Sequence, residues 1–170
     1  LYELPFGRGK TFADMGGVVN QIIGGWQIGS IITVQSGRPL NMQAGFDVSG
    51  TYNYGEVRLS ATGENPYAAK RTSEQWFNPA GFRLPDPGGF GDISRNRLIG
   101  PSSFSWDFST LKNFPILEGH DLQFRFEAFN FPNHPNLGSP NLVWGSRNPT
   151  PGPNFGKIRS TGTMRQLQFA

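Results

Sequence analysis

The sequence predicts an all-β fold in which antiparallel strands follow one another up and down, joined by connections that alternate between short and long. Three observations support this fold class. The 170 residues include 23 Gly and 14 Pro, well above an ordinary share of about 12% for the two together. Aromatic residues reach 14%, whereas charged residues are only 16%. Five segments alternate between apolar and polar residues with the period of a β-strand.

The first two predicted strands lie near the start of the chain. Residues 1–6 alternate imperfectly and are expected to form the end of a strand. Residues 24–42 alternate more regularly, and residues 26–35 alone are long enough to cross a tilted barrel wall. Trp26 lies at one end of this stretch, where it suits an aromatic girdle at a membrane interface. One predicted face carries Trp26, Ile28, Ser30, Ile32 and Val34, and the other carries Gln27, Gly29, Ile31, Thr33 and Gln35.

Three further strands are predicted over residues 102–114, 120–131 and 164–170. In each of them apolar residues alternate with residues that are mainly small or polar. The short polar link at residues 117–120 predicts a tight hairpin between the third and fourth strands. The predicted apolar positions are Phe104, Trp106, Phe108, Leu122, Phe124, Phe126, Ala128, Leu167 and Phe169.

Two long connections separate the strands, at residues 43–99 and 131–154. Loops of this length are uncommon inside compact soluble domains and usually have a function. Within the first, Thr72 and Gln75 have the spacing of a capping box and predict one or two helical turns over residues 72–77. Short connections on one side of a sheet and long ones on the other are typical of an outer-membrane barrel.

The alternation also fits a soluble β-sandwich, which buries one face and exposes the other to water. Two details favour a membrane barrel. The apolar face is rich in aromatic side chains, and the opposite face carries small or polar side chains that suit a wet lumen. The mean hydropathy of −0.42 is compatible with barrel strands, whose alternation keeps the average modest.

The remaining features predict no enzyme, no cofactor, no metal and no nucleic-acid partner. The net charge is +3, and the basic residues are scattered rather than gathered in a run or stripe. There is no cysteine, which excludes disulfides and thiolate metal sites. His120 and His134 lack partners at metal-ligand spacing, and we expect both to be loop residues. No catalytic motif accompanies the carboxylates Asp86, Asp92, Asp107, Glu118, Asp121 and Glu127.

Residues 4–11, "LPFGRGKT", resemble the end of a phosphate-binding loop. Such a loop needs a glycine where this chain has Leu4, and Pro5 removes one backbone donor. It also needs a helix directly after it, and the adjacent Gly16 and Gly17 oppose one. We therefore interpret the segment as a strand end followed by a polar turn.

The long connections contain many aromatic residues. These side chains either stack on a flat ligand such as a sugar, or pack the loops onto each other and onto a barrel rim. Packing is the interpretation we favour. The residues concerned are Tyr52, Tyr54, Tyr67, Trp76, Phe77, Phe82, Phe90 and Trp144.

The order and the sequences of six segments resemble the C-terminal end of TonB-dependent outer-membrane receptors of the Oar-like type, which are abundant in Acidobacteria and their relatives. The resemblance covers nearly the whole chain, and the segments run in the order of that family. They are "YELPFGRGK" (2–10), "GGWQIGSIITVQSGRPL" (24–40), "QWFNPAGF" (75–82), "SRNRLIGPSSFSWDFSTLKNF" (94–114), "LQFRFEAFNFPNHPNLGSPN" (122–141) and "FGKIRSTGTMRQLQFA" (155–170).

This resemblance implies a barrel of roughly 22 strands with a plug inside, preceded by a carboxypeptidase-regulatory-like β domain. It implies uptake of a bulky ligand across the outer membrane, driven by the TonB complex. Residues 1–170 are then a C-terminal fragment of the barrel domain with about five strands and two unpaired edges. The plug and N-terminal domains are absent, and the family normally continues a few residues to a terminal aromatic. The implied partners are outer-membrane lipid, an unknown transported ligand and, through the missing N-terminal parts, the TonB complex.

The resemblance and the loop lengths together imply an orientation in a Gram-negative outer membrane. With the C-terminus in the periplasm, residues 43–97 and 132–154 lie outside the cell. The turns at residues 11–23 and 115–121 then lie in the periplasm. The alternative function is a soluble or surface β-module that binds carbohydrate or a protein partner, which the aromatic-rich residues 44–90 motivate.

Overall fold

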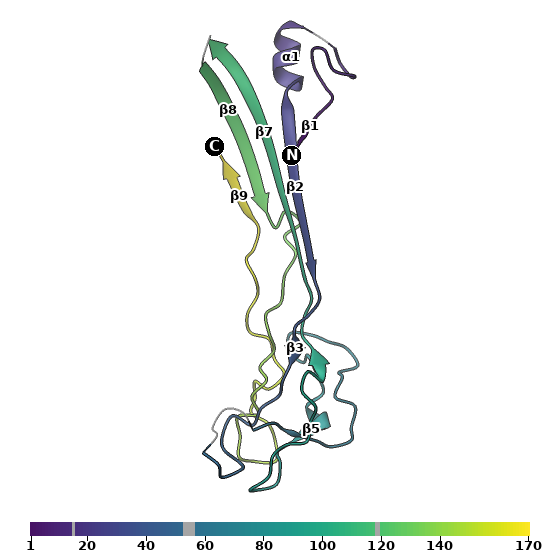
Figure 1. Cartoon of the computed structure of the whole chain (residues 1–170), viewed down its shortest axis with the longest axis vertical. Coiled ribbons are helices and arrows are strands. Elements are labelled where there is room, and N and C mark those ends of the chain that lie inside the picture. Colours follow the sequence, from purple (N-terminus) through teal and green to yellow (C-terminus); the bar gives the residue numbers. More distant parts are fainter. Residues whose placement is uncertain (15, 53–56, 118–119) are drawn as a thin grey trace. The chain divides into compact units, whose positions relative to one another are not determined.

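The computed structural model describes residues 1–14, 16–52, 57–117 and 120–170, which fold as two compact units. The first unit comprises Leu1–Val34, Phe104–Pro135 and Thr163–Ala170, and the second comprises Gln35–Ser103 and Asn136–Gly162. The elements in chain order are β1 (Tyr2–Glu3), α1 (Gly17–Ile23), β2 (Trp26–Gln35), β3 (Pro39–Leu40), β4 (Ser60–Ala61), η1 (Pro79–Gly81), β5 (Phe82–Arg83), β6 (Leu98–Ile99), β7 (Ser103–Leu117), β8 (His120–Phe129) and β9 (Gln166–Phe169) (Figure 1).

The first unit is built on a five-stranded sheet with the order β1-β2-β7-β8-β9, so strands that follow one another in this unit are neighbours. β1 pairs antiparallel with β2, and β8 pairs antiparallel with both β7 and β9. Figure 1 shows that β2 and β7 also run in opposite directions. The five predicted strands and their up-and-down order are therefore confirmed. Among the described residues the sheet is open, with β1 and β9 at its edges.

The second predicted strand is shorter in the structure than the sequence indicates. β2 ends at Gln35, and the chain then forms β3, which pairs antiparallel with β6 in the second unit. The break coincides with a close approach of two backbone segments at Gly37. A Cβ atom on Gly37 would lie 1.9 Å from the carbonyl oxygen of Gly100, so only glycine fits there. The prediction of one continuous strand over residues 24–42 is therefore wrong beyond Gln35.

The pairing of β7 with β8 continues up to the connection that joins the two strands. Its register continues to the pair Leu117 and His120, with an irregularity between Pro115 and Leu117. β7 therefore ends three residues beyond the predicted boundary at residue 114. The pair Leu117 and His120 agrees with the predicted tight hairpin, although residues 118–119 of that link lie outside the described residues.

A seven-residue helix, α1, lies between β1 and β2 (Figure 1). The expectation that Gly16 and Gly17 oppose a helix here is wrong. Both glycines lie at its start: Gly16 is the N-cap, and Gly17, with φ of +66°, is the first helical residue. Glycine is tolerated at an N-cap, and its entropic cost is largest in the helix interior. Across the described residues, no helix combines the length and the apolar character needed to cross a membrane.

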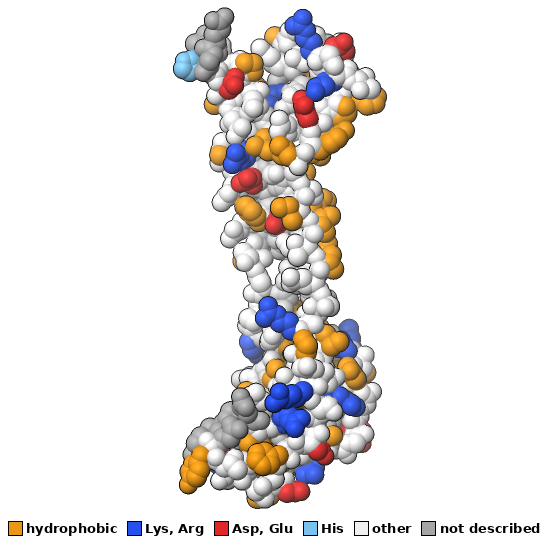
Figure 2. Space-filling model, in the orientation of Figure 1, with side chains coloured by type: hydrophobic (Ala, Val, Ile, Leu, Met, Phe, Trp, Pro, Cys, Tyr) orange, Lys and Arg blue, Asp and Glu red, His pale blue; other side chains and the backbone are white. Residues whose placement is uncertain are grey.

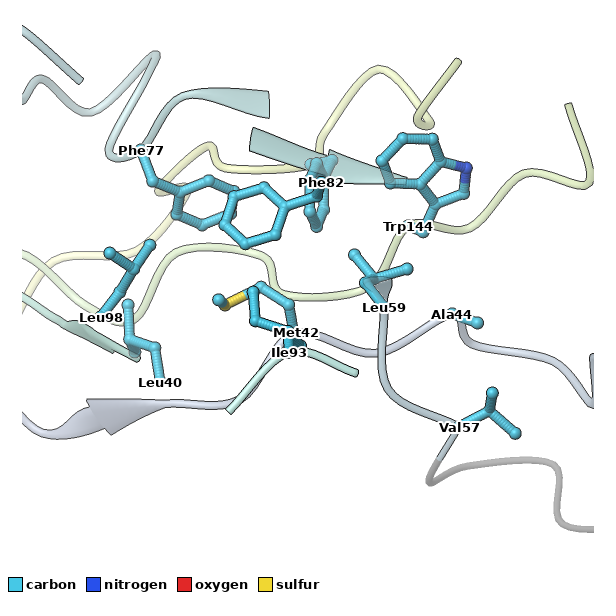
Figure 3. Packing of buried hydrophobic residues seen from close by; sticks show 11 residues of the cluster. Leu40, Met42, Ala44, Val57, Leu59, Phe77, Phe82, Ile93, Leu98 and Trp144 are labelled. Carbon is cyan, nitrogen blue, oxygen red and sulfur yellow. The ribbon is translucent and has the colours of Figure 1, made fainter. Parts of the chain in front are cut away.

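The second unit has a hydrophobic core made by the long connections themselves. Its aromatic rings pack edge to face: the Phe77 ring centroid lies 5.4 Å from that of Phe82 and 5.0 Å from that of Phe155. Trp144 lies 5.4 Å from Phe155 in the same cluster. Figure 3 shows the side chains of Phe77, Phe82 and Trp144 converging from segments far apart in the sequence. The buried core residues are Leu40, Met42, Ala44, Val57, Leu59, Phe77, Phe82, Ile93, Leu98, Trp144 and Phe155.

The capping-box spacing at Thr72 and Gln75 does not start a helix. The Thr72 hydroxyl accepts a hydrogen bond from the Gln75 backbone N–H at 3.1 Å, as a cap would. However, the Gln75 carbonyl accepts a hydrogen bond from the Thr72 N–H at 3.0 Å, which closes a tight turn. The predicted helical turns over residues 72–77 are therefore wrong. The short helix η1 follows instead, with the Asn78 side chain accepting a hydrogen bond from the Ala80 N–H at 3.1 Å.

Candidate functional site: the two faces of the strand sheet

The strand register sorts the side chains of β7, β8 and β9 onto two faces. Directly opposite residues on neighbouring strands point to the same side of a sheet. Phe108 is opposite Ala128, and Thr110 is opposite Phe126, which is in turn opposite Phe169. The rings of Phe126 and Phe169 are in contact, with centroids 5.0 Å apart. The predicted apolar positions of these three strands therefore share one face.

β2 and β1 add to the same apolar face. The Trp106 indole N–H of β7 donates a hydrogen bond to the Ser30 hydroxyl of β2 at 2.8 Å, so these two residues lie on one side. Tyr2 of β1 is opposite Ile28 of β2 and joins them. The face predicted from the sequence is thus confirmed in the structure. It carries Tyr2, Trp26, Ile28, Ile32, Val34, Phe104, Trp106, Phe108, Phe114, Leu122, Phe124, Phe126, Ala128, Leu167 and Phe169.

The apolar face is exposed rather than covered by a second layer of the described chain. Val34 is 72% exposed, Ile32 is 61% exposed and Phe169 is 69% exposed. Figure 2 shows hydrophobic side chains on the surface along the part of the molecule that holds the sheet. A β-sandwich would bury one face, and a water-soluble monomer rarely exposes so large an apolar surface. The geometry therefore favours a sheet whose apolar face is covered by lipid.

The opposite face of the sheet is mainly polar and internally hydrogen-bonded, although Ile31, Leu111 and Phe129 also lie on it. The Gln123 amide donates to Asn113 Oδ1 at 2.9 Å and accepts from Arg125 Nη2 at 3.1 Å. Asp107 Oδ1 accepts from the Ser105 hydroxyl at 3.2 Å and from the Asn130 backbone N–H at 2.9 Å. These partners keep the polar groups of this face hydrogen-bonded, and Asn113, Gln123 and Arg125 are also exposed, as side chains that line a water-filled lumen would be.

A pocket of about 270 Å³ lies against the sheet and brings two carboxylate residues together. Its lining includes Asp107 and Glu127 together with Ser109 and Gly29. Gly29 makes room for this arrangement, because a Cβ on it would lie 2.5 Å from the Ser109 hydroxyl oxygen. Of the carboxylates considered from the sequence, Asp86 instead pairs with Arg83, and Asp92 accepts a hydrogen bond from the Ala61 N–H. Glu118 lies outside the described residues.

The two histidines lie apart from any cluster of metal-ligating side chains. His134 packs against Phe104 with ring centroids 5.7 Å apart, and its backbone N–H donates to Asn130 Oδ1 at 3.0 Å. His120 is the first residue of β8 rather than a loop residue, because it pairs with Leu117. Within the described ranges, no group of three or more His, Asp and Glu side chains is arranged to hold a metal ion.

Lys112 is a charged residue on the apolar face, and the structure gives it a defined place. It is only 2% exposed, and its Nζ donates to the carbonyl oxygens of Ile22, at 3.1 Å, and of Gly24. The ammonium lies 5.2 Å from the Trp26 ring centroid and 5.1 Å from that of Phe114. The Trp26 indole N–H also donates to the Ile22 carbonyl, at 2.9 Å. This cluster joins an aromatic group and a long cationic side chain at one end of the apolar face, the combination expected at a membrane interface.

The segment at residues 4–11 does not form a phosphate cradle, because its backbone donors are already used. Lys10 Nζ forms an ion pair with Glu3 Oε1 at 3.1 Å, whereas the lysine of a phosphate-binding loop would contact the phosphate. The interpretation as a strand end and a polar turn is thus favoured. The backbone pairs are Gly7 N–Phe12 O (3.1 Å), Arg8 N–Asn20 Oδ1 (2.6 Å), Gly9 N–Asp14 Oδ1 (2.8 Å) and Lys10 N–Gly7 O (3.0 Å).

The described aromatic residues of the long connections divide into three groups. Phe77, Phe82 and Trp144 are buried in the second unit, which favours the packing interpretation for them. Tyr52 and Phe90 are 82% and 65% exposed. Tyr67 and Trp76 lie beneath the same cation, with Arg71 Cζ 5.4 Å and 5.7 Å from their ring centroids. Tyr54 lies outside the described residues.

Two of the contacts that shape this surface have no signal in the local sequence. The bond from Lys112 to α1 joins residues 90 positions apart, and no local pattern indicates it. The use of Asn20 and Asp14 as acceptors for the loop amides was likewise missed. The sequence signal for α1 was the spacing of Val18, Val19, Ile22 and Ile23, which is compatible with one face of a short helix.

An open antiparallel sheet with an exposed apolar face and a polar opposite face defines a wall segment of an outer-membrane-type β-barrel. Comparison with protein families agrees: the family described as "Outer membrane beta barrel domain" matches residues 1–168. The chain belongs to this family, and membership indicates an outer-membrane location. No curated protein and no solved structure matches the chain significantly.

Proposed function

We propose that this chain is the C-terminal part of the barrel of an Oar-like TonB-dependent receptor in a Gram-negative outer membrane. The parent protein takes up a bulky ligand with energy from the TonB complex. The observation that supports this most strongly is the organisation of the connections. The two long ones, between β2 and β7 and between β8 and β9, supply the second unit with its own buried core. Long folded loops on one side of a barrel wall suit ligand capture outside the cell.

In this proposal the chain is not an enzyme and needs no cofactor. Its direct partner is outer-membrane lipid along the apolar face, and the TonB complex contacts other parts of the parent. Residues 43–97 and 132–154 lie outside the cell, and the connections at residues 11–23 and 115–121 lie in the periplasm. In the parent protein, the plug and the outer loops together recognise the transported ligand.

Orientation and location are tested with epitope tags in the parent protein. One tag follows Gly88, an exposed glycine of the first long connection with φ of +80°, and the matched tag follows Thr11. Antibody labelling of intact cells is expected for the Gly88 tag alone, and labelling of both only after the outer membrane is permeabilised. Recovery of the parent in the soluble periplasmic fraction would contradict the proposal.

Transport is tested separately from location. Cells with and without the parent, and with and without an intact TonB complex, are compared for accumulation of isotope-labelled solutes from the medium. Accumulation that requires both the parent and TonB supports the receptor proposal. Accumulation that requires the parent but persists without TonB would leave an outer-membrane barrel and reject the TonB-dependent type.

The second candidate is a soluble or surface module that binds carbohydrate or a protein partner. The exposed rings of Tyr52 and Phe90 are the observation that favours it, because exposed aromatics stack on sugars. The two candidates predict different behaviour of the chain expressed alone in water. A monodisperse monomer without detergent supports the module, whereas aggregation that detergent prevents supports the barrel segment.

A further inference from the structure

A pocket of about 210 Å³ in the second unit is lined by polar side chains that can donate hydrogen bonds, and none of the described lining residues is a carboxylate. The lining residues are Asn41, Gln43, Arg58 and Arg95. Two guanidinium groups and two amides around one hollow form a set of donors without a built-in anion. Such a set is electrostatically incomplete unless an anionic group enters it.

Two of the lining residues, Gln43 and Arg58, lie on segments that pack into the hydrophobic core. Gln43 and Arg58 are opposite each other in an antiparallel bridge. The hydrogen bonds flank this pair rather than joining it, and in such a pair the side chains lie close together. Because the residues on either side of each are buried in the core, Gln43 and Arg58 point away from it. Those core residues are Met42, Ala44, Val57 and Leu59, and the flanking bonds are Ala44 N–Val57 O (2.9 Å) and Leu59 N–Met42 O (3.4 Å).

Arg58 is fixed in place but keeps free donors. Its Nη1 donates to the carbonyl oxygen of Ile93 at 2.7 Å, which uses one of the five guanidinium N–H groups. The side chain is partly buried, and Arg58 forms no ion pair with the described residues. A half-buried guanidinium with open donors is a stronger anion ligand than a fully hydrated one, because water competes less for its charge.

Asn41 and Arg95 complete the lining of the pocket. Asn41 Oδ1 accepts a hydrogen bond from the Asn96 backbone N–H at 2.8 Å, and Asn96 adopts a left-handed φ of +58°. This bond holds the turn that carries Arg95 and leaves the Asn41 amide N–H groups as donors. Arg95 is exposed and forms no ion pair within the described part of the chain.

The charge of the second unit also attracts anions. Its sequence segments contain ten Lys and Arg against six Asp and Glu, a net charge of +4. The ion pairs of this unit join Arg83 to Asp86 and join Lys157 and Arg159 to Glu74. Within the described ranges, neither of the two pocket arginines takes part in an ion pair. Figure 2 shows several Lys and Arg side chains over this unit, with few acidic side chains among them.

We propose that this pocket binds an oxyanion, the phosphate or carboxylate group of a dissolved ligand. The paired guanidinium groups of Arg58 and Arg95 bind its oxygens, and the amides of Asn41 and Gln43 add neutral donors that orient it. The proposal goes beyond membrane transport, because it concerns binding by the outer loops alone and holds whether or not the parent depends on TonB.

The experiment is a titration of the full chain, refolded in micelles of a neutral detergent. Inorganic phosphate and acetate are added in separate series, with chloride adjusted to keep the ionic strength constant, and amide NMR signals are followed. Saturable shifts at Asn96 and Arg58 are expected with at least one of the two anions, and the stronger binder identifies the class. Absence of saturable shifts with both anions would overturn the proposal.

Variants connect the binding to the two arginines. Arg95→Gln, at an exposed position, is expected to weaken binding about tenfold or more, because a charge-assisted hydrogen bond is lost. Arg58→Lys keeps the charge but loses the planar fork, and a smaller loss is expected. Arg147→Gln is the matched control, since it removes the same charge from the same unit at a residue that stacks 4.8 Å from the Phe46 ring. Equal weakening by Arg95→Gln and Arg147→Gln would show general screening and reject the site.

Discussion

Lys112 of β7 donates a hydrogen bond to the carbonyl oxygen of Ile22, near the end of α1, across 90 residues of sequence and at 3.1 Å. The same ammonium group reaches the carbonyl of Gly24. The last carbonyl groups of a helix have no partner inside it, and a cation there also interacts favourably with the helix dipole. One lysine on the apolar face therefore links the connection between β1 and β2 to strand β7 of the sheet.

Replacing Lys112 with Met tests this tie. The substitution keeps an unbranched stem but leaves two carbonyls without their charged donor, so we expect a loss of about 1–3 kcal/mol in the free energy of unfolding. The measurement is urea unfolding of the chain in micelles, with hydrogen exchange at the α1 amides as a local probe. Arg125→Met, an exposed residue opposite Leu111 on the polar face, is the control and should change stability by less than about 0.5 kcal/mol. Equal losses in the two variants would argue against a special role for Lys112.

The assignment of the two faces is tested by a matched pair of charged substitutions at Ile32 and Thr33. Both residues are exposed and adjacent in β2, but they point to opposite sides of the sheet. In water the two positions should tolerate arginine equally. If lipid covers the apolar face, Ile32→Arg should lower stability in lipid bilayers by about 2 kcal/mol more than Thr33→Arg does. The comparison is made by denaturant titration in vesicles, and equal effects would reject a lipid-facing surface at Ile32.

The faces of the sheet could be predicted from sequence because strand side chains alternate whatever the tertiary surroundings. Alternation within each strand and apolar character together placed Trp106 and Phe126 on the same face, and the register of β7 with β8 confirms it. The start of α1 was missed for the opposite reason. A helix this short is marginal by itself, and its last carbonyls are satisfied by Trp26 and by the distant Lys112.

The second unit was less predictable because its structure depends on contacts between distant segments. The aromatic residues of the loops indicated packing or ligand binding, but only the structure separates buried Phe77 from exposed Phe90. Likewise, the break at Gly37 depends on the approach of Gly100, which no local pattern indicates. The anion pocket combines Gln43, Arg58 and Arg95, and their proximity follows from a bridge and a turn rather than from spacing.

The core of the second unit should be sensitive to truncation at Trp144. This side chain is 2% exposed and packs against Phe155. Trp144→Ala is therefore expected to lower the free energy of unfolding by about 3–5 kcal/mol. The expected signature is loss of the near-ultraviolet circular dichroism of the aromatic cluster. Phe90→Ala removes a ring that is 65% exposed and should leave the spectrum and the stability nearly unchanged. A similar response of the two variants would contradict the buried aromatic core.

Asp47 gives a pH-dependent prediction for the first long connection. Its Oδ1 accepts hydrogen bonds from the Ser49 hydroxyl at 2.8 Å and the Gly50 N–H at 2.9 Å, and its Oδ2 accepts from the Tyr52 N–H at 2.7 Å. Desolvation raises the pKa of this carboxyl, but the hydrogen bonds from Ser49, Tyr52 and Gly50 together outweigh it. The pKa of Asp47 therefore lies below its ordinary value of 3.8.

The sign of the effect follows from this direction. A group whose pKa is lower in the folded chain favours folding at pH values above its ordinary pKa of 3.8, and that contribution is lost as the pH falls through the lower folded value. The amide signals of Gly50 and Tyr52 should therefore follow a titration whose midpoint lies below pH 3.8, and they should lose exchange protection as the carboxylate is protonated. NMR titration of the Asp47 carboxyl measures the midpoint, and Asp47→Asn is the control that should abolish the transition. A midpoint at or above 3.8 would show that desolvation outweighs the hydrogen bonds in this loop.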